Sequence, residues 1–392
     1  MKNYKSMVAM LLALVMILCV AACGKNETVE DGDDSEPIKI GYVNDLTGDG
    51  AGWGVPAMRG AEMAVAEINA NGGLLGREVQ LIVQDGRGDP QDSVTALNKL
   101  IGDECVAVVG TTTSGPNIAM APVADGAEVP LLGLGCSNEQ VTVDENGNLH
   151  PYSFRLTYID SFSGEALAKY LYAEGYKTAG VLINQGDAYS VGVTDAFIDA
   201  YEAIGGKIVV EEDAYDTDSD FRAQLTNIKA ADPEVFVFNW SYTYAALIAQ
   251  QAKEMGLEMQ YAGTDGWDVY NLAEMANGAL EGAFYCARAT FLSDESLEFK
   301  QKYFDAYPEE TECGSESLLG CEAINWLAKA ITEKNSADPK DIRDYLENTT
   351  YYESELLGDF SVNEFHNLEI ELVAYEIKDG ERIVRDYISI GE

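Results

Sequence analysis

The chain has 392 residues, of which 47% are hydrophobic and 37 are glycines, a composition typical of a folded α/β protein rather than a disordered one. This length is enough for two substantial cores, because domains usually contain about 50–250 residues. The 67 acidic residues outnumber the 25 basic ones and give a formal net charge of −42. Such a field repels phosphate backbones, so we do not expect nucleic acid as a partner.

The first residues have the order of an export signal, with two lysines ahead of an apolar run over residues 7–20. This run is shorter than the roughly 20 residues that a membrane span needs. The sequence Val20-Ala21-Ala22-Cys23-Gly24 follows it and resembles the bacterial lipobox. We therefore expect residues 1–22 to be a signal peptide, Cys23 to carry lipid, and residues 23–37 to be an acidic tether. The protein would then be anchored to the outer face of the cell membrane.

From residue 38 the hydrophobic pattern alternates between strands and helices. A first set has expected strands at 38–45, 78–85, 105–110 and 130–135, with helices at 56–73, at 89–103 and after Pro116. A second set has expected strands at 178–185, 207–215, 234–240, 259–267 and 283–289, with helices at 163–175, 192–206, 220–233 and 245–256. Further helices are expected at 295–307, 318–334 and 338–348, and a hairpin at 368–387 around Asp379-Gly380. Asp89 and Asp220 are expected to cap their helices.

Alternation at this spacing predicts parallel sheets with helices on both faces. Two such sets predict an α/β fold of two doubly wound, Rossmann-like lobes with a cleft between them. We expect lobe 1 to comprise residues 38–158 plus 289–367, and lobe 2 to comprise residues 159–288 plus 368–392. The chain would cross between the lobes near residues 158, 288 and 367, forming a three-strand hinge.

Four consecutive hydroxyl residues, 111–114, stand where an apolar strand gives way to the helix after Gly115-Pro116. Ser and Thr side chains satisfy the first N–H groups of helices, and Pro is favoured at the first helical position, so these residues could simply cap the helix. Alternatively, the same N–H groups and hydroxyls could hold a carboxylate or phosphate.

Parallel sheets bind ligands beyond the carboxyl ends of their strands, so the loops after each strand are the candidate site. These loops contain no histidine and no lysine, which leaves little for acid–base or nucleophilic catalysis, so we expect no enzyme activity, no metal and no cofactor. A zwitterionic amino acid instead needs hydroxyl and N–H donors, one carboxylate and an apolar wall. The loops supply Ser114 and Ser137 as donors, Asp265 as the carboxylate, and Trp53, Tyr189, Tyr242 and Trp267 as the wall.

The stretches IKIGYVNDLTGDGAGWG, RGAEMAVAEINANGGLLGREVQLIVQD, FRLTYIDSFSGEALAKYL and DFRAQLTNIKAADPEVFVF resemble the branched-chain amino acid (Leu/Ile/Val) binding proteins of ABC importers. These are type I periplasmic solute-binding proteins, and the resemblance runs nearly end to end.

The resemblance implies roles for individual positions. Ser114 and Ser137 would bind the ligand carboxylate, and the Gly135 carbonyl and Asp265 would bind its ammonium. Tyr189 and Trp53 would cover the ligand, and Asp160 would lie near the cleft. There are departures. The family's Tyr-Gly is Tyr189-Ser190 here, the covering tyrosine falls at 241 or 242, and Gly88 and Thr113 occupy the positions of a disulfide found in some members. These departures affect the expected side-chain preference of the site.

Two of the seven cysteines precede the expected mature domain, Cys19 in the signal peptide and Cys23 at the lipid. The remaining five are Cys105, Cys136, Cys286, Cys313 and Cys321. Because five is an odd number, at least one thiol is expected to be free or paired between chains. Cys313 and Cys321 could form a bridge or remain separate thiols.

The function expected from the sequence is that of an extracellular substrate-binding lipoprotein of an ABC importer. It would act as a monomer, capture a branched-chain, aliphatic or aromatic amino acid in the cleft, and deliver it to a membrane permease. The alternative is a sensor domain for amides or other small solutes.

Overall fold

The computed structural model describes residues 36–368 and 370–388 of the chain. The predicted signal peptide (1–22), the lipidation of Cys23 and nearly all of the predicted tether (23–37) therefore lie outside the described residues. Among the residues described, no helix is both long enough and apolar enough to cross a membrane.

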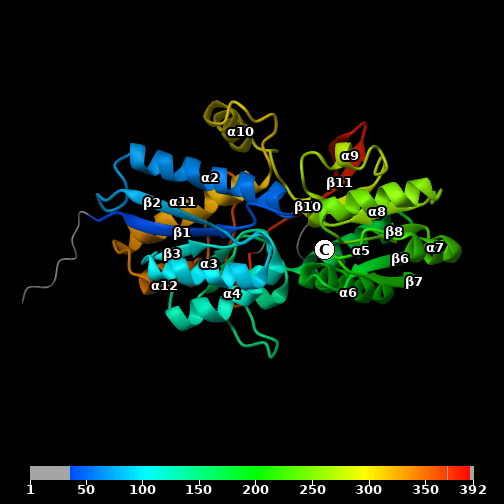
Figure 1. Ribbon diagram of the computed structural model, residues 1–392, viewed down its shortest axis with the longest axis horizontal. Helices are drawn as coiled ribbons and strands as arrows, with labels where there is room; N and C mark the ends of the chain where they lie inside the picture. The colour runs from blue at the N-terminus through cyan, green and yellow to red at the C-terminus, as the bar shows by residue number, and fades with distance from the viewer. Residues whose placement is uncertain (1–35, 369, 389–392) are drawn as a thin grey trace, which may run out of the picture. The chain divides into compact units, whose positions relative to one another are not determined.

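Two α/β sheets form the fold, as the alternating pattern predicts. The first sheet has five strands in the order β2-β1-β3-β4-β5, and the second has seven in the order β12-β11-β10-β9-β8-β6-β7. All pairs in the first sheet are parallel, whereas β11 pairs antiparallel with both β10 and β12 in the second. Figure 1 shows the two sheets in separate groups of elements, each with helices on both faces. The fold is thus a pair of doubly wound lobes.

The strands of the first lobe are β1 (Ile38–Asn44), β2 (Val79–Asp85), β3 (Ala107–Val109), β4 (Leu131–Gly133) and β5 (Ser153–Arg155). Its helices are α2 (Ala51–Ala70), α3 (Pro90–Gly102), α4 (Ser114–Ala127), η1 (Glu139–Val141), α10 (Asp294–Ala306), α11 (Glu316–Lys334) and α12 (Pro339–Glu347). The last three come from late in the chain, and α11 packs against α2.

The strands of the second lobe are β6 (Thr178–Asn184), β7 (Lys207–Ala214), β8 (Val235–Val237), β9 (Gln260–Gly263), β10 (Phe284–Arg288), β11 (Leu372–Lys378) and β12 (Glu381–Ile388). Its helices are α5 (Asp160–Ala173), α6 (Ala188–Ala203), α7 (Arg222–Ala231), α8 (Tyr242–Glu254), η2 (Asp265–Trp267) and α9 (Leu272–Met275). The chain passes between the two groups of elements after β5, after β10 and again before β11.

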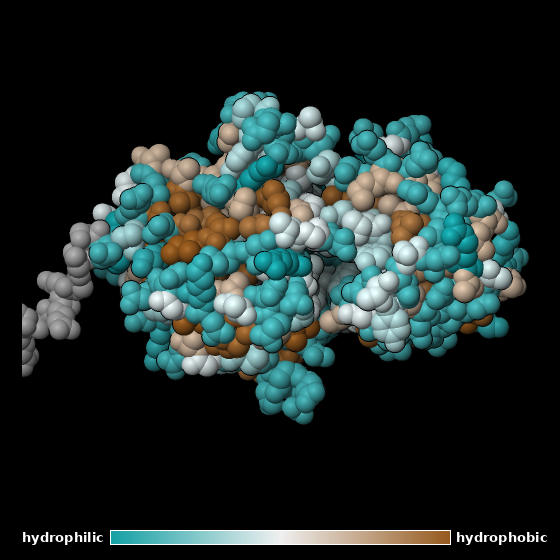
Figure 2. Space-filling model, viewed as in Figure 1, coloured by the Kyte–Doolittle hydropathy of each residue, from teal (hydrophilic) through white to brown (hydrophobic). Residues whose placement is uncertain are grey.

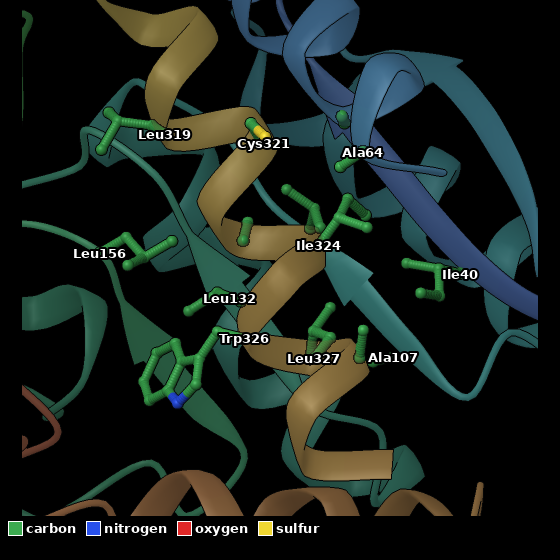
Figure 3. Close-up of a cluster of buried hydrophobic side chains, with 14 of the residues drawn as sticks. Ile40, Ala64, Ala107, Leu132, Leu156, Leu319, Cys321, Ile324, Trp326 and Leu327 are labelled. Carbon is green, nitrogen blue, oxygen red and sulfur yellow. The ribbon is translucent and has the colours of Figure 1, made fainter. Parts of the chain in front are cut away.

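Helix α11 forms the centre of the first core. Figure 3 shows Ile324 and Leu327 of this helix on the side of Ile40 and Ala107 of the sheet, and all four belong to the same buried cluster. Its other neighbour, α2, approaches closely through two glycines. A β-carbon on Gly60 would lie 1.9 Å from the Ser317 carbonyl oxygen, and one on Gly320 would lie 1.8 Å from that of Ala57. The two helices can therefore pack at this distance only with glycine at both positions.

The predicted helix caps and the predicted hairpin turn are partly confirmed. Asp89 caps α3 by accepting hydrogen bonds from the N–H groups of Gln91 and Asp92. The predicted hairpin turn is present, with Asp379 and Gly380 at φ +54° and +82°. Asp220 accepts from the Arg222 N–H at 3.1 Å, although the helix-capping position itself is Phe221.

Two helices begin earlier than predicted. Helix α2 starts at Ala51 rather than at Pro56, which lies inside the helix. Helix α4 starts at Ser114 rather than after Pro116. Pro116 lies in the first turn of α4, where the N–H groups have no intrahelical partner, so proline costs no hydrogen bond there. Pro56 is the sixth residue of α2, beyond the first turn, and removes one hydrogen bond of the helix.

The five cysteines within the described residues are all buried and free, so Cys313 and Cys321 do not form a disulfide.

Hydrophilic residues cover most of the face drawn in Figure 2, which agrees with the large acidic excess of the sequence.

Candidate functional site

A cavity of about 400 Å³ lies between the strand-end loops of the two lobes. Its size falls within the range of about 300–1,000 Å³ typical of small-molecule sites. The predicted site residues that line it are Trp53, Ser114, Gly135, Tyr189 and Asp265. The carboxyl ends of parallel strands converge there, as the strand-end rule predicts.

The hydroxyl run at residues 111–114 lies on the first-lobe wall of the cavity. The Thr111 hydroxyl donates to the Thr113 carbonyl at 2.7 Å, and the Thr112 N–H and hydroxyl both donate to Asn44 Oδ1 at 3.1 Å. Thr113 occupies the capping position of α4 without a capping hydrogen bond from its side chain. The threonines therefore hold the loop in shape instead of capping the helix.

Ser114 is the first residue of α4, and both Ser114 and Gly115 line the cavity. Its Oγ accepts a hydrogen bond from the Asn138 N–H at 3.2 Å, so its own hydrogen remains available as a donor. The first N–H groups of a helix have no intrahelical partner and carry partial positive charge. This part of the wall is suited to an anionic group.

Asp45 joins two loops of the same wall. Its Oδ1 accepts from the Gly88 N–H at 2.8 Å, and its Oδ2 accepts from the Thr113 hydroxyl at 3.0 Å. These are the two positions at which the family resemblance places a disulfide in some members. Burial raises the pKa of Asp45, and the hydrogen bonds from Thr113 and Gly88 oppose that shift. The Asp45 carboxylate, with its two hydrogen bonds, thus links the two loops that contain the positions of that disulfide.

The segment after β4 is fixed from behind by Arg155. This fully buried arginine donates through Nη1 to the carbonyls of Cys136 and Ser137, and through Nη2 to the Glu139 carbonyl and the Thr142 hydroxyl. Burial lowers its pKa. Arg155 therefore sets the course of the backbone that presents Gly135 to the cavity.

Two predicted site residues lie behind that segment. Ser137 and Asp160 are fully buried and do not line the cavity. Asp160 Oδ2 accepts from Asn138 Nδ2 at 3.1 Å. Burial raises the pKa of Asp160 well above its usual value, and the negative charge of Glu139 adds to the shift.

Asp265 lies on the second-lobe wall of the cavity, which also includes Asp187 and Asp216. It is only partly buried as a residue, yet its Oδ1 is shielded from solvent and has no hydrogen-bond partner among the described residues. Burial raises the pKa of Asp265, while the Arg288 charge and the hydroxyls of Tyr158 and Tyr189 lower it. A carboxylate placed in this way is ready to accept a hydrogen bond from a ligand cation.

Tyr189 is positioned beside that acid by two hydrogen bonds. Its hydroxyl contacts Thr264 Oγ1 at 2.7 Å and accepts from the Gly266 N–H at 2.8 Å. Thr264 directly follows β9 and Gly266 lies in η2, so Tyr189 is held by the same short segment that contains Asp265.

The four predicted aromatic residues separate into two groups. Trp53 lines the cavity and meets Tyr242 edge to face, with ring centroids 4.7 Å apart. The Tyr242 hydroxyl accepts from the Gly52 N–H at 2.9 Å, which ties α8 to the first lobe, but Tyr242 itself does not line the cavity; Tyr244 does. Trp267 is buried in the second-lobe core, where its Nε1 donates to the Phe238 carbonyl at 3.1 Å.

Of the nine charged residues that line the cavity, eight are absent from the sequence-based candidates, including Arg288 and Glu316. Arg288 ends β10 and Glu316 begins α11, and both are almost fully buried. The position of Arg288 at the end of β10 is one at which the strand-end rule predicts site residues. Glu316 has no strand before it, and only the packing of α11 on α2 brings it to the cavity.

A family model for periplasmic binding proteins matches residues 37–382. A Leu/Ile/Val-binding protein homolog 2 from Brucella abortus (strain 2308) is 28% identical over 336 residues, covering 84% of this chain and 87% of that protein. A leucine-, isoleucine-, valine-, threonine-, and alanine-binding protein from Pseudomonas aeruginosa is 25% identical over 318 residues, covering 81% of this chain and 84% of that protein.

Solved structures are similar over nearly the whole chain. The branched-chain amino acid transporter substrate binding protein LivJ from Streptococcus pneumoniae, in complex with isoleucine, matches with a TM-score of 0.82 and 25% identity. That match covers 91% of this chain and 99% of the other. The leucine binding protein LivK from Thermotoga maritima matches with a TM-score of 0.83 and 25% identity, covering 90% and 99%.

The chain therefore belongs to the periplasmic binding protein family. Its relatives are solute-binding proteins of ABC transporters rather than enzymes, and membership implies a location outside the cytoplasm.

Proposed function

We propose that this protein is the extracellular substrate-binding lipoprotein of an ABC importer and that it captures a free amino acid in the cavity between its lobes. The observation that carries the proposal is the opposition of two walls. On one, α4 begins with Ser114 at the cavity; on the other, Asp265 has a carboxylate oxygen without a partner. Together they suit the negative and positive ends of an amino acid.

In this proposal Ser114 and the first turn of α4 receive the ligand carboxylate. The Gly135 carbonyl and Asp265 receive the ammonium, and Trp53 and Tyr189 cover the ligand. The other predicted residues, Ser137, Asp160, Tyr242 and Trp267, would support these groups from behind.

Closure would accompany binding because each lobe supplies one half of the contacts. The three chain crossings near residues 158, 288 and 367 would form the hinge, with the lobes bounded as the sequence predicts. The bound form would then be recognised by the permease.

Membrane attachment through lipid on Cys23 is part of the proposal. Changing Cys23 to alanine should release the protein from the cell membrane into the soluble extracytoplasmic fraction. Mass spectrometry of the intact mature protein should detect diacylglycerol on the unchanged chain and none on the variant.

Ligand capture is tested by a thermal-shift screen of the purified protein against the twenty amino acids and a set of small amides, followed by calorimetry of the hits. We expect stoichiometric binding of at least one amino acid with its α-amino and α-carboxyl groups free, and no binding of its N-acetyl or methyl-ester derivative. Binding of amides alone would favour the sensor alternative, and failure of all amino acids would overturn the proposal.

A further inference from the structure

The cavity contains more charge than the main chain of an amino acid requires. Seven acidic residues and two arginines line it. Asp265 is the acid assigned to the ammonium in the proposed function, on which the present inference rests. Three further charged residues in the wall are almost fully buried: Asp45, Arg288 and Glu316.

Arg288 and Glu316 form an incomplete ion pair. Their nearest charged atoms, Nη2 and Oε1, are 3.5 Å apart, and the side chains are 6% and 5% exposed. Arg288 Nη1 donates to the Thr157 hydroxyl at 2.8 Å, and its Nε has no partner among the described residues. Glu316 Oε2 accepts from the Ser315 hydroxyl at 3.0 Å. A carboxylate can accept up to about four hydrogen bonds, so Glu316 retains capacity for a ligand donor.

Negative charge prevails around this pair. The Ser315 hydroxyl also lies 3.0 Å from Asp268 Oδ2, so its single hydrogen is shared between two acids, and Asp268 lies next to Glu316. Asp268 in turn pairs with Arg382 at 2.5 Å. Within the cavity itself Arg288 is offset by Glu316 and Asp265, so it does not act as a free positive charge toward a ligand.

An aliphatic ligand side chain would fit this environment poorly. It would remove water from Glu316 and Arg288 without supplying hydrogen bonds in return, and uncompensated burial of charged groups is costly. A side chain with a cationic donor would instead complete the hydrogen bonding of Glu316 and reduce the acidic excess of the cavity.

We propose that the ligand is an amino acid with a positively charged side chain and that Glu316, at the start of α11, is the residue that selects it. The basic group of the side chain would donate to the Glu316 carboxylate, while the α-ammonium binds Asp265.

A ligand panel tests the class directly. Calorimetry with the purified protein at pH 8 compares L-lysine, L-ornithine and L-arginine with L-leucine, L-glutamine and L-glutamate. We expect one of the basic amino acids to bind at least about tenfold more tightly than any of the other three, as a charge-assisted hydrogen bond implies. Tightest binding of leucine, glutamine or glutamate would overturn this inference while leaving the proposed amino acid function in place. If none of these amino acids binds and the twenty-member screen also fails, the proposed function itself fails.

Variants assign the selection to one residue. Glu316→Gln retains the shape but not the charge, and should weaken the best basic ligand by at least about tenfold while changing leucine by less than about threefold. Glu322→Gln is the matched control, because Glu322 lies on the same helix, is equally buried, and accepts from Tyr352 and Ser354 away from the cavity. It should leave ligand affinity unchanged. An unchanged affinity of Glu316→Gln for the basic ligand, in a protein that still unfolds cooperatively, would overturn the role of Glu316.

Discussion

Asp45 in the first lobe and Asp265 in the second both lie at a strand end facing the cavity, yet the two carboxylates have opposite surroundings. Asp45 in the first lobe has both oxygens hydrogen-bonded, to Gly88 and Thr113. Asp265 in the second lobe has one oxygen shielded from solvent without any partner among the described residues. Burial raises the pKa of both. The difference teaches that hydrogen-bond saturation, rather than burial, separates a structural acid from one that is ready for a ligand.

The largest effect should come from Asp265→Asn. The variant removes the counter-charge of the ligand ammonium, and truncating one partner of a buried charged pair costs about 2–5 kcal/mol, which is at least about 30-fold in affinity. Calorimetry with the ligand found in the screen measures this. Asp268→Asn does not serve as a control, because Asp268 pairs with Arg382. Asp199→Asn does, because Asp199 is exposed on α6 of the same lobe and does not line the cavity; it should alter affinity by less than about threefold.

The same variant should not destabilise the unliganded protein. The folded-state pKa of Asp265 is raised, so its contribution to stability is present at low pH and is lost as the pH rises through that pKa. Above that pKa the ionised group opposes folding, and asparagine removes this penalty. Chemical unfolding at pH 7 should give an equal or higher free energy of unfolding for Asp265→Asn. A clear loss would mean that Asp265, like Asp45, is structural.

Asp45→Ala should show the reverse pattern. It leaves the Gly88 N–H and the Thr113 hydroxyl without their acceptor, and an unsatisfied buried polar group costs about 1–3 kcal/mol. Urea unfolding should report this loss, with Asp49→Ala in the same loop as the control that changes stability by less than about 0.5 kcal/mol. Ligand affinity should fall only to the extent that the loops of Gly88 and Thr113 change conformation in the variant. Unaltered stability of Asp45→Ala would break the contrast between the two acids.

The site residues that follow from local sequence patterns could be predicted from the sequence. Ser114, Gly135 and Asp265 follow apolar strands, and strand ends of a parallel sheet meet at one edge, so their meeting at the cavity was predictable. The threonine hydroxyls were expected either to cap a helix or to bind an anion. They hold the loop instead, because Asn44 on the neighbouring strand β1 accepts from Thr112.

The remaining differences depend on tertiary packing. Glu316 reaches the cavity because Gly60 and Gly320 let α2 and α11 approach closely, a contact between segments more than 250 residues apart that no local pattern contains. Trp267 lies only two residues after Asp265, but the short helix η2 turns its side chain into the core against Phe238. Hydrophobic content alone does not distinguish an aromatic that faces a ligand from one that faces the core.

A moderate effect is expected from pH. Burial and the negative charge of Asp268 raise the pKa of Glu316 to about 8, while the Arg288 charge and the Ser315 hydrogen bond oppose the shift; Arg382 faces the group from beyond Asp268. A cationic ligand side chain would bind the ionised carboxylate, so binding should release a proton and affinity should rise from pH 6 to pH 8 by at least about tenfold. Calorimetry in two buffers of different ionisation enthalpy measures the released proton. Proton release that persists undiminished in Glu316→Gln would assign it to another group.

The smallest effect should come from Tyr189→Phe. The Tyr189 hydroxyl is shared with Thr264 and Gly266, so its loss removes one hydrogen-bonding group of about 1 kcal/mol, roughly fivefold in affinity. Because this hydroxyl lowers the pKa of Asp265, its removal should raise that pKa further. The loss of affinity should therefore be larger at pH 6 than at pH 8, since more of Asp265 would be protonated at the lower pH. Equal losses at both pH values would mean that Tyr189 covers the ligand without changing the pKa of Asp265. The readiness of Asp265 to bind a ligand cation would then not depend on the Tyr189 hydroxyl.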